Sequence, residues 1–148
     1  MSESSPSQFG DNWALARGTW DDDLPISMRI RLDIDDYVAS PQFPVGYRIT
    51  RKFDAPNERG QPSAEDMDLM ELFEEKLVSA FESSGTAIIA LIVTHNGERD
   101  YSCYTADPDA THALFNETFS SEPLKPLSFS SGPDPEWQEY LTFRTQVE

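Results

Sequence analysis

The residues whose types suit them to chemistry are two histidines and one cysteine. His95 and His112 lack the HxxxH or CxxC spacing of a protein metal site, so a pair of histidines with a carboxylate is the one metal alternative left. Cys103 alternates with Tyr101 and Thr105 in a predicted strand, where a cysteine is typically a small core residue. The sequence has no GxSxG, HExxH or glycine-rich phosphate motif. We therefore predict no catalytic residue, metal or cofactor.

Carboxylates are concentrated on the longest predicted helix, residues 63–83. We expect Glu71, Glu74 and Glu75 to lie on its exposed side, opposite an apolar stripe that enters the core. The same side is expected to hold Glu65, Asp68 and Glu82. A cation site usually draws its carboxylates from several helices or from a loop, so chelation is disfavoured. Two interpretations remain: a solvated charged face, or a docking surface that attracts a basic protein partner.

Basic residues are gathered near the N-terminus, where six of the 11 lie between positions 17 and 52. Those on the polar faces of predicted strands form a candidate basic stripe: Arg29, Arg31, Arg48 and Lys52. The structural interpretation is cross-strand pairing with Asp33 and Asp35. The functional interpretation is a site for an anion or an acidic peptide on the open face of a sheet. Both require the strands that carry these residues to be neighbours.

Hydrophobic periodicity predicts the elements that position these side chains. The expected strands are residues 12–20, 27–35, 45–53, 86–94, 99–105 and 127–131. The expected helices are residues 63–83, residues 108–119 and a short terminal helix that begins at Asp134 and Pro135. Residues 1–11 are predicted to be a disordered tail and residues 12–148 a single domain.

Local signals mark the ends of several of these elements. Ser63 and Asp66 have the form of a capping box at the start of the long helix, and Gly85 suits a left-handed residue at its end. The pair Asn96 and Gly97 favours a type I′ hairpin turn between two strands.

The order of elements predicts the fold class. From residue 45 onward it reads strand, helix, two strands joined by a hairpin, helix, strand, which is the order of a ferredoxin-like split βαβ sheet with helices on one face. An N-terminal β-hairpin and a short C-terminal helix extend this α+β domain. The continuous apolar run 87–93 indicates a strand covered on both faces. Its second cover is expected from the N-terminal tryptophan segment or from a second subunit, which would make a homodimer.

Composition narrows the classes of partner and location. The chain has 148 residues, 38% of them hydrophobic, which is enough apolar material for a folded core. Its 27 acidic and 11 basic residues give a formal charge of −16, which repels phosphate backbones and disfavours direct nucleic-acid binding. A single cysteine excludes an internal disulfide, and neither a signal peptide nor a membrane span is evident. We expect a soluble, cytoplasmic protein that does not bind membranes.

Two short motifs indicate a family. The run Thr94-His95-Asn96-Gly97-Glu98-Arg99 with Tyr104-Thr105, and the tail Asp134-Pro135-Glu136-Trp137-Gln138-Glu139-Tyr140, resemble the bacterial domain-of-unknown-function 695 family. The similarity covers most of residues 12–143. It implies a small intracellular α+β domain without an established activity, and supplies no catalytic residues.

Two functions follow as hypotheses. The first is a non-enzymatic binding or regulatory domain that presents its acidic helix face to a basic protein. The second is a protein or enzyme that binds a small anionic molecule. Its site would use either the basic stripe or an amphipathic pocket rim formed by Arg99, Tyr104, Trp137 and Tyr140. If the motif residues do not converge in this way, Trp137 and Tyr140 are expected to clamp the tail onto the sheet.

Overall fold

The computed structural model describes residues 12–19, 25–53, 62–95, 97–120 and 127–144. These residues form six strands, three α-helices and one 3₁₀ turn. The strands are β1 (Trp13–Thr19), β2 (Pro25–Arg31), β3 (Val45–Lys52), β4 (Ala87–His95), β5 (Glu98–Thr105) and β6 (Leu127–Pro133). The helices are α1 (Ala64–Ser83), α2 (Pro108–Thr118) and α3 (Gln138–Arg144), and the 3₁₀ turn is η1 (Asp35–Tyr37). The protein is therefore of the α+β class, as the sequence predicts.

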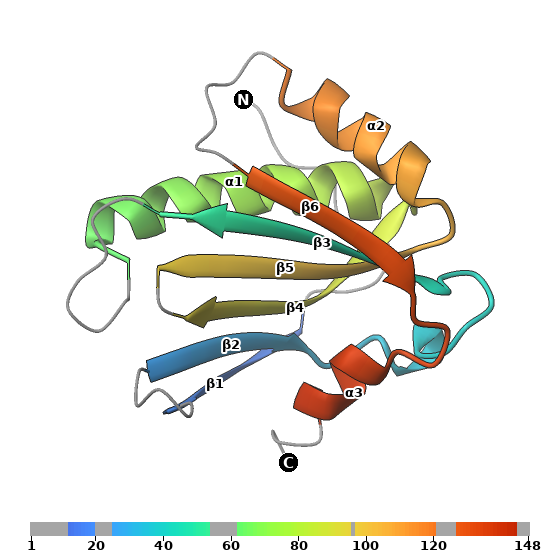
Figure 1. The fold of residues 1–148 in the computed structure, drawn as a ribbon, viewed down its shortest axis with the longest axis horizontal. Coiled ribbons are helices and arrows are strands. Elements are labelled where there is room, and N and C mark those ends of the chain that lie inside the picture. The colour runs from blue at the N-terminus through green and yellow to red at the C-terminus, as the bar shows by residue number, and fades with distance from the viewer. Residues whose placement is uncertain (1–11, 20–24, 54–61, 96, 121–126, 145–148) are drawn as a thin grey trace.

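All six strands belong to one antiparallel sheet with the order β1-β2-β4-β5-β3-β6 (Figure 1). The hairpin β1–β2 adds to the sheet at β4, as expected for an N-terminal extension. Helix α1 connects β3 to β4 and α2 connects β5 to β6, and in both cases one strand lies between the two that are joined.

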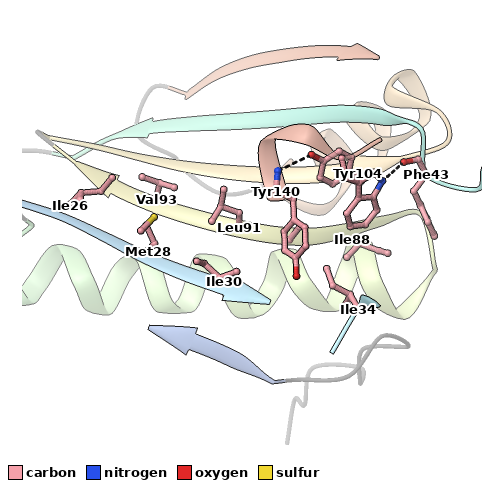
Figure 2. Packing of buried hydrophobic residues seen from close by; sticks show 12 residues of the cluster. Ile26, Met28, Ile30, Ile34, Phe43, Ile88, Leu91, Val93, Tyr104 and Tyr140 are labelled. Carbon is pink, nitrogen blue, oxygen red and sulfur yellow. Dashed lines mark hydrogen bonds between the residues drawn. The ribbon is translucent and has the colours of Figure 1, made fainter. Parts of the chain in front are cut away.

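The core has two layers, one on each face of the sheet. Helices α1 and α2 pack on one face through Phe73, Leu77 and Phe115, together with the sheet residues Ile49 and Tyr101. We call this the α1–α2 face. Helix α3 packs on the opposite face, the α3 face, where its tyrosine and the preceding tryptophan join the aliphatic residues of β2 and β4 (Figures 1 and 2). The second cover of β4 thus comes from the C-terminal end of the chain, and Trp13 instead packs on the α1–α2 face.

A β-bulge in β4 reverses the alternation of its side chains. Ile89 pairs with Cys103 and Leu91 pairs with Ser102, so Ala90 is an extra residue on this strand. Ile89 and Ile92 consequently share the α1–α2 face, although strict alternation would place them on opposite faces. Because residues 87–93 are all apolar, both registers bury hydrophobic side chains, and the sequence pattern leaves the bulge undetermined.

The ends of α1 follow the predicted signals. The Ser63 hydroxyl accepts a hydrogen bond of 3.1 Å from the Asp66 backbone N–H, which satisfies one of the free donors at the helix start. Gly85 has φ of +73°, a left-handed conformation that costs glycine little, and the Thr86 N–H then reaches the Phe81 carbonyl at 3.0 Å. The helix is therefore held in register at both ends.

Two predicted boundaries differ from the structure by four residues. Strand β2 ends at Arg31, four residues before the predicted end, because the chain turns into η1, where the Tyr37 N–H bonds the Ile34 carbonyl at 2.9 Å. The terminal helix begins at Gln138, because a turn closed by the Trp137 N–H and the Asp134 carbonyl comes first. The Asp134 carboxylate nevertheless accepts from the Gln138 N–H at 2.8 Å, so it caps the helix across this turn.

Some predictions lie outside the described residues. The N-terminal tail 1–11 and residue 96 of the predicted type I′ turn belong to this group. Gly97, the second turn residue, is described and has φ of +82°, a value compatible with such a turn.

Candidate functional site

The centre of the polar network on the α1–α2 face is Glu74 of α1. Its carboxylate accepts four hydrogen bonds, from Arg29 of β2 at 3.0 Å, from Arg99 of β5 at 2.8 and 3.1 Å, and from the Tyr101 hydroxyl at 2.8 Å. Arg99 also donates to the Thr94 hydroxyl at 2.7 Å. Burial alone would lower the pKa of Arg99, but Glu74 raises that pKa above its usual value. One carboxylate therefore serves two guanidinium groups.

A second buried ion pair lies two helical turns further along α1. Glu82 accepts a bidentate contact from Arg31 of β2, at 2.9 and 2.5 Å, and a third hydrogen bond from the Ile89 N–H at 2.8 Å. The Glu82 side chain is fully buried and that of Arg31 is 1% exposed. Asp33 also lies 3.3 Å from Arg31 Nε, but it follows Arg31 by two residues on the same segment, so this contact is not the cross-strand pairing that the sequence predicts. Trp13 lies over both Arg29 and Arg31, with ring centroids 4.8 and 4.7 Å from the guanidinium carbons.

The prediction that Glu74 and Glu82 lie on the exposed side of α1 is wrong, because both are buried. Seven residues of α1 are buried, and Glu74 and Glu82 are among them. Arginines of the sheet bind both carboxylates, which allows the two acids to lie next to the buried apolar side chains. Their positions in the sequence could have indicated this burial. Glu74 lies four residues after Met70, and Glu82 directly follows Phe81, so both adjoin the apolar stripe of the helix. Sequence reasoning also missed Thr94 and Tyr101 as members of the network.

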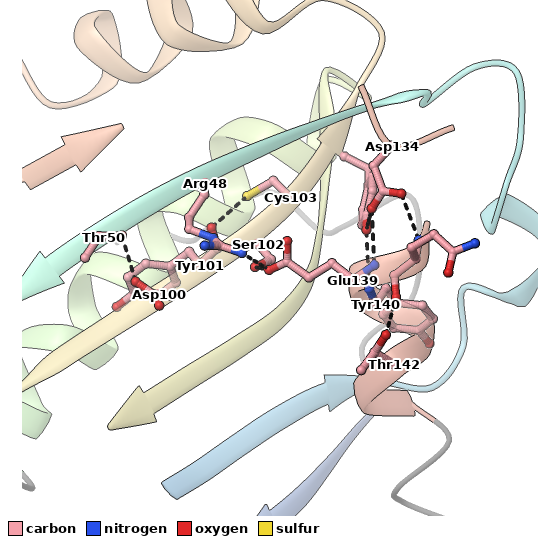
Figure 3. Close-up of polar contacts among 12 residues, drawn as sticks. Arg48, Thr50, Asp100, Tyr101, Ser102, Cys103, Asp134, Glu139, Tyr140 and Thr142 are labelled. Atoms are coloured by element: carbon pink, nitrogen blue, oxygen red, sulfur yellow. Dashed lines mark hydrogen bonds and ion pairs between the residues drawn. The ribbon is translucent and has the colours of Figure 1, made fainter. Parts of the chain in front are cut away.

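The basic stripe does not exist as one surface. Arg29 and Arg31 lie on the α1–α2 face, where they bind α1. Arg48 lies on the α3 face, where it pairs with Glu139 of α3 (Figure 3), and β4 and β5 separate β2 from β3. Lys52 is exposed at the end of β3. Alternation assigned each residue correctly to the polar side of its own strand, but these sides point in opposite directions.

Three of the aromatic motif residues meet, but Arg99 is not with them. Tyr104 and Trp137 stack with centroids 4.0 Å apart and planes 7° from parallel, and Tyr140 packs edge-on to Trp137. The Trp137 indole donates to the Phe43 carbonyl at 2.8 Å, and the Tyr140 hydroxyl donates to the Arg31 carbonyl at 2.5 Å. All three rings are buried on the α3 face, where they hold α3 against the sheet (Figure 2). Arg99 lies on the other face.

Beside this aromatic cluster, a polar groove of about 430 Å³ lies over β5, β3 and β6 next to the start of α3. Ser102 donates to Glu139 at 2.7 Å, and Glu139 also binds Arg48 (Figure 3). The Tyr104 hydroxyl donates to Asp134 at 2.7 Å. These polar groups are bound to one another, and the groove has one guanidinium against two carboxylates, so it offers no excess positive charge to an anion.

A different cavity, of about 550 Å³, lies over β1, β2 and β4 near the start of α1. Arg17, Arg29 and Arg99 line it, together with the hydroxyl residues Ser27 and Thr94. Its apolar walls include Leu15, Met67 and Ile92. The cavity thus brings together Arg99, which the sequence assigned to the candidate pocket rim, and Arg29, which it assigned to the basic stripe. These two residues were not predicted to lie in one site.

The outer side of α1 presents acids and leucines to solvent. Glu71 and Glu75 are exposed, together with Leu69 and Leu72, which are 44% and 64% exposed. Asp68 lies on the same exposed turn. We call these five residues, Asp68, Leu69, Glu71, Leu72 and Glu75, the outer α1 face. It retains two of the three glutamates named as a docking surface, while Glu74 binds Arg29 and Arg99 inside.

His112 and Cys103 lie among side chains of the folded core and of its edge. His112 Nδ1 is 2.8 Å from the Tyr47 hydroxyl, and its ring packs on Phe129. His95 is half-buried at the end of β4. Cys103 is buried in the α1–α2 core cluster. Among the described residues, no three His, Cys, Asp or Glu side chains are grouped as a metal ion would require.

Burial of these hydroxyl and thiol groups predicts a loss of stability in alkali. Burial raises the pKa of the Cys103 thiol far above its usual value, and the pKa values of Tyr47, Tyr101 and Tyr104 are raised for the same main reason. The folded protein then keeps protons that the unfolded chain releases above pH ~8.5 for cysteine and ~10 for tyrosine. The free energy of unfolding should therefore fall as pH rises, by up to about 1.4 kcal/mol per pH unit for each group.

Urea unfolding between pH 8 and 11 measures this dependence. In Cys103→Ala one group is removed, so the slope between pH 9 and 10 should decrease by up to about 1.4 kcal/mol per pH unit. An unchanged slope in this variant would contradict the assignment of Cys103 as a buried, protonated thiol.

The fold and the two ion-pair networks define a small α+β domain in which helix carboxylates bind arginines of a six-stranded antiparallel sheet. The chain belongs to the DUF695 family: the model of this family of unknown function matches residues 11–144. No curated protein and no solved structure matches the chain. In the described part of the chain, no helix has the length and apolar character needed to cross a membrane.

Proposed function

We propose that this protein is a non-enzymatic binding domain that docks a basic, partly apolar segment of another protein on the outer α1 face. The observation that carries the proposal is the exposure of Leu69 and Leu72, at 44% and 64%, between exposed carboxylates of one helix. Exposed leucines next to each other gain free energy when a partner covers them. The surrounding acids would select a basic partner and accelerate its association.

The rest of the molecule supports this assignment. The formal charge of −16 makes the long-range field attractive to basic proteins and repulsive to nucleic acid. Glu74 and Glu82 anchor the inner side of α1 through buried ion pairs, so the outer α1 face is presented on a fixed helix. A rigid surface loses little conformational entropy when it binds.

The proposal extends to the architecture. The strand order β4-β5-β3-β6, with connections through α1 and α2, supports a ferredoxin-like split βαβ unit to which the hairpin β1–β2 has been added. In this arrangement α1 is a crossover helix whose inner side covers the sheet and whose outer side is available to a partner. The lone cysteine is compatible with a reducing, cytoplasmic location.

The test is a quantitative pull-down from cell lysate, followed by titration of the purified partner. Glu71→Lys/Glu75→Lys should weaken the complex at least about tenfold, because each reversal replaces an attraction by a repulsion. Leu72→Ser, which keeps the charge, should weaken it as well. Binding should also decrease between 50 and 500 mM salt, since the screening length for surface charges shortens from about 14 Å to about 4 Å over this range.

The matched control is Glu117→Lys/Glu136→Lys. Both glutamates are exposed and lie outside α1, and the net charge changes by the same amount as in the test variant. This control should retain the complex. A partner captured equally by all variants, or lost equally from both charge-reversed proteins, would rule out the outer α1 face as the docking surface.

A further inference from the structure

We propose that the cavity lined by Arg17, Arg29 and Arg99 binds a small organic anion with an apolar body, such as an aromatic or aliphatic carboxylate, sulfonate or phosphate. This site is separate from the outer α1 face and does not depend on the docking proposal. Its volume of about 550 Å³ lies in the range typical of small-molecule sites.

The charge balance around the cavity favours an anion. Arg29 and Arg99 share the single carboxylate of Glu74, so the three groups together carry one net positive charge. Glu74 already accepts four hydrogen bonds, one of them from Arg29, so its acceptor sites are occupied and the remaining N–H groups of Arg29 must bond elsewhere. Among the described residues, no carboxylate lines the cavity, while Arg17 adds a third guanidinium.

The hydrogen-bond donors are partly fixed in place. Arg99 is 5% exposed and is held by Glu74 and Thr94, which use three of its five N–H groups. Arg29 uses Nη1 for Glu74, is 41% exposed, and is stacked on Trp13. A guanidinium that is already oriented by one carboxylate and an aromatic ring binds a second anion with little further loss of side-chain entropy.

The apolar walls of the cavity favour an anion that carries an apolar group. Met67 of α1 and Ile92 of β4 face the same cavity as the arginines. Leu15 of β1 also lines it and is 59% exposed. A ligand with an aromatic or aliphatic body would cover these side chains, whereas inorganic phosphate would leave them in water.

The experiment compares two fluorescent probes that share an apolar body. The anionic probe is 8-anilinonaphthalene-1-sulfonate, and the neutral probe is N-phenyl-1-naphthylamine, which lacks the sulfonate. Equilibrium titration of the full native chain should show one site that binds the sulfonate at least tenfold more tightly than the neutral probe. Tenfold corresponds to about 1.4 kcal/mol.

Single substitutions locate the site. Arg29→Gln leaves one arginine for Glu74 and removes one of the two excess positive charges, so it should weaken the sulfonate about tenfold, equivalent to ~1.4 kcal/mol, and leave the neutral probe unchanged. Arg48→Gln is the matched control, because Arg48 is 42% exposed and also binds one glutamate, but on the α3 face. It should change neither affinity. Arg17→Gln should weaken the sulfonate about threefold.

Several outcomes would overturn the proposal. Equal affinity for the two probes would show that the charge plays no part, and equal weakening by Arg48→Gln would show that binding is not at this cavity. If Arg29→Gln does not fold, as judged by circular dichroism, Arg17→Gln decides. Arg17 is exposed, so its replacement should not disturb the core, and an unchanged sulfonate affinity in that variant would then reject the site.

Discussion

Replacement of Glu82 by alanine is expected to lower the free energy of unfolding by about 3–5 kcal/mol. The change removes the bidentate partner of Arg31 and the acceptor of the Ile89 N–H. Arg31 is only 1% exposed, so its charge would remain buried with Asp33 as a partial partner at 3.3 Å. An uncompensated buried charge costs much more than the loss of an exposed ion pair.

Thermal and urea unfolding of Glu82→Ala measure this effect. For a domain of this length, the melting temperature should fall by roughly 10 °C. Glu75→Ala is the control, because Glu75 is exposed on the same helix and its loss should change stability by less than about 0.5 kcal/mol. The double variant Arg31→Met/Glu82→Leu should recover most of the lost stability, because apolar residues replace both charges together. A loss below about 1 kcal/mol in Glu82→Ala would contradict the buried pair.

Replacement of Trp137 by alanine is expected to cost about 3–5 kcal/mol. Trp137 is fully buried, stacks on Tyr104 at 4.0 Å, and donates to the Phe43 carbonyl at 2.8 Å. Its loss leaves a cavity beneath α3 and removes one hydrogen bond to the Phe43 carbonyl. Because Trp137 and Tyr140 attach α3 to the sheet, the amides of α3 should also exchange hydrogen faster in this variant.

The backbone of Trp137 permits a sharper comparison. Its φ of +58° is left-handed, a conformation that costs a residue with a Cβ about 1–2 kcal/mol more than glycine. Trp137→Gly should therefore be less destabilising than Trp137→Ala by about 1 kcal/mol, the reverse of the usual order inside a regular element. Urea unfolding of the two variants measures the difference. Alanine more stable than glycine at this position would contradict the left-handed backbone.

The local elements were predictable because their signals are local. Helix 63–83 was expected from apolar spacing and from Ser63 and Gly85, and the structure has α1 at Ala64–Ser83. The predicted ends of elements were wrong where a turn lies next to the element, at η1 after β2 and at the turn before α3. Neither turn has a strong residue signature: the residue with positive φ before α3 is a tryptophan, where a glycine or asparagine would have been the recognisable signal.

The candidate site was only partly predictable. Arg99 and Arg29 were both named from the sequence, but as members of different sites, and Glu74 was expected in solvent. Their meeting depends on β5 and β2 flanking β4 under one helix, which is a long-range property of the sheet. Pairings between residues 45 and 25 positions apart, as in Arg29–Glu74 and Glu74–Arg99, leave no signature in local periodicity.

The amino-acid sequence by itself determined that this chain is acidic, that it folds as an α+β domain, and which side chains share a face of β2 and of β3. Only the tertiary structure decided which face of the sheet each set occupies. Side-chain alternation has a period of two within one strand, so it carries no information about the neighbouring strand or about the extra residue at Ala90. Strand order and register therefore determined that Arg29 and Arg48 lie on opposite faces, and that the carboxylate of Glu74 is buried between two arginines.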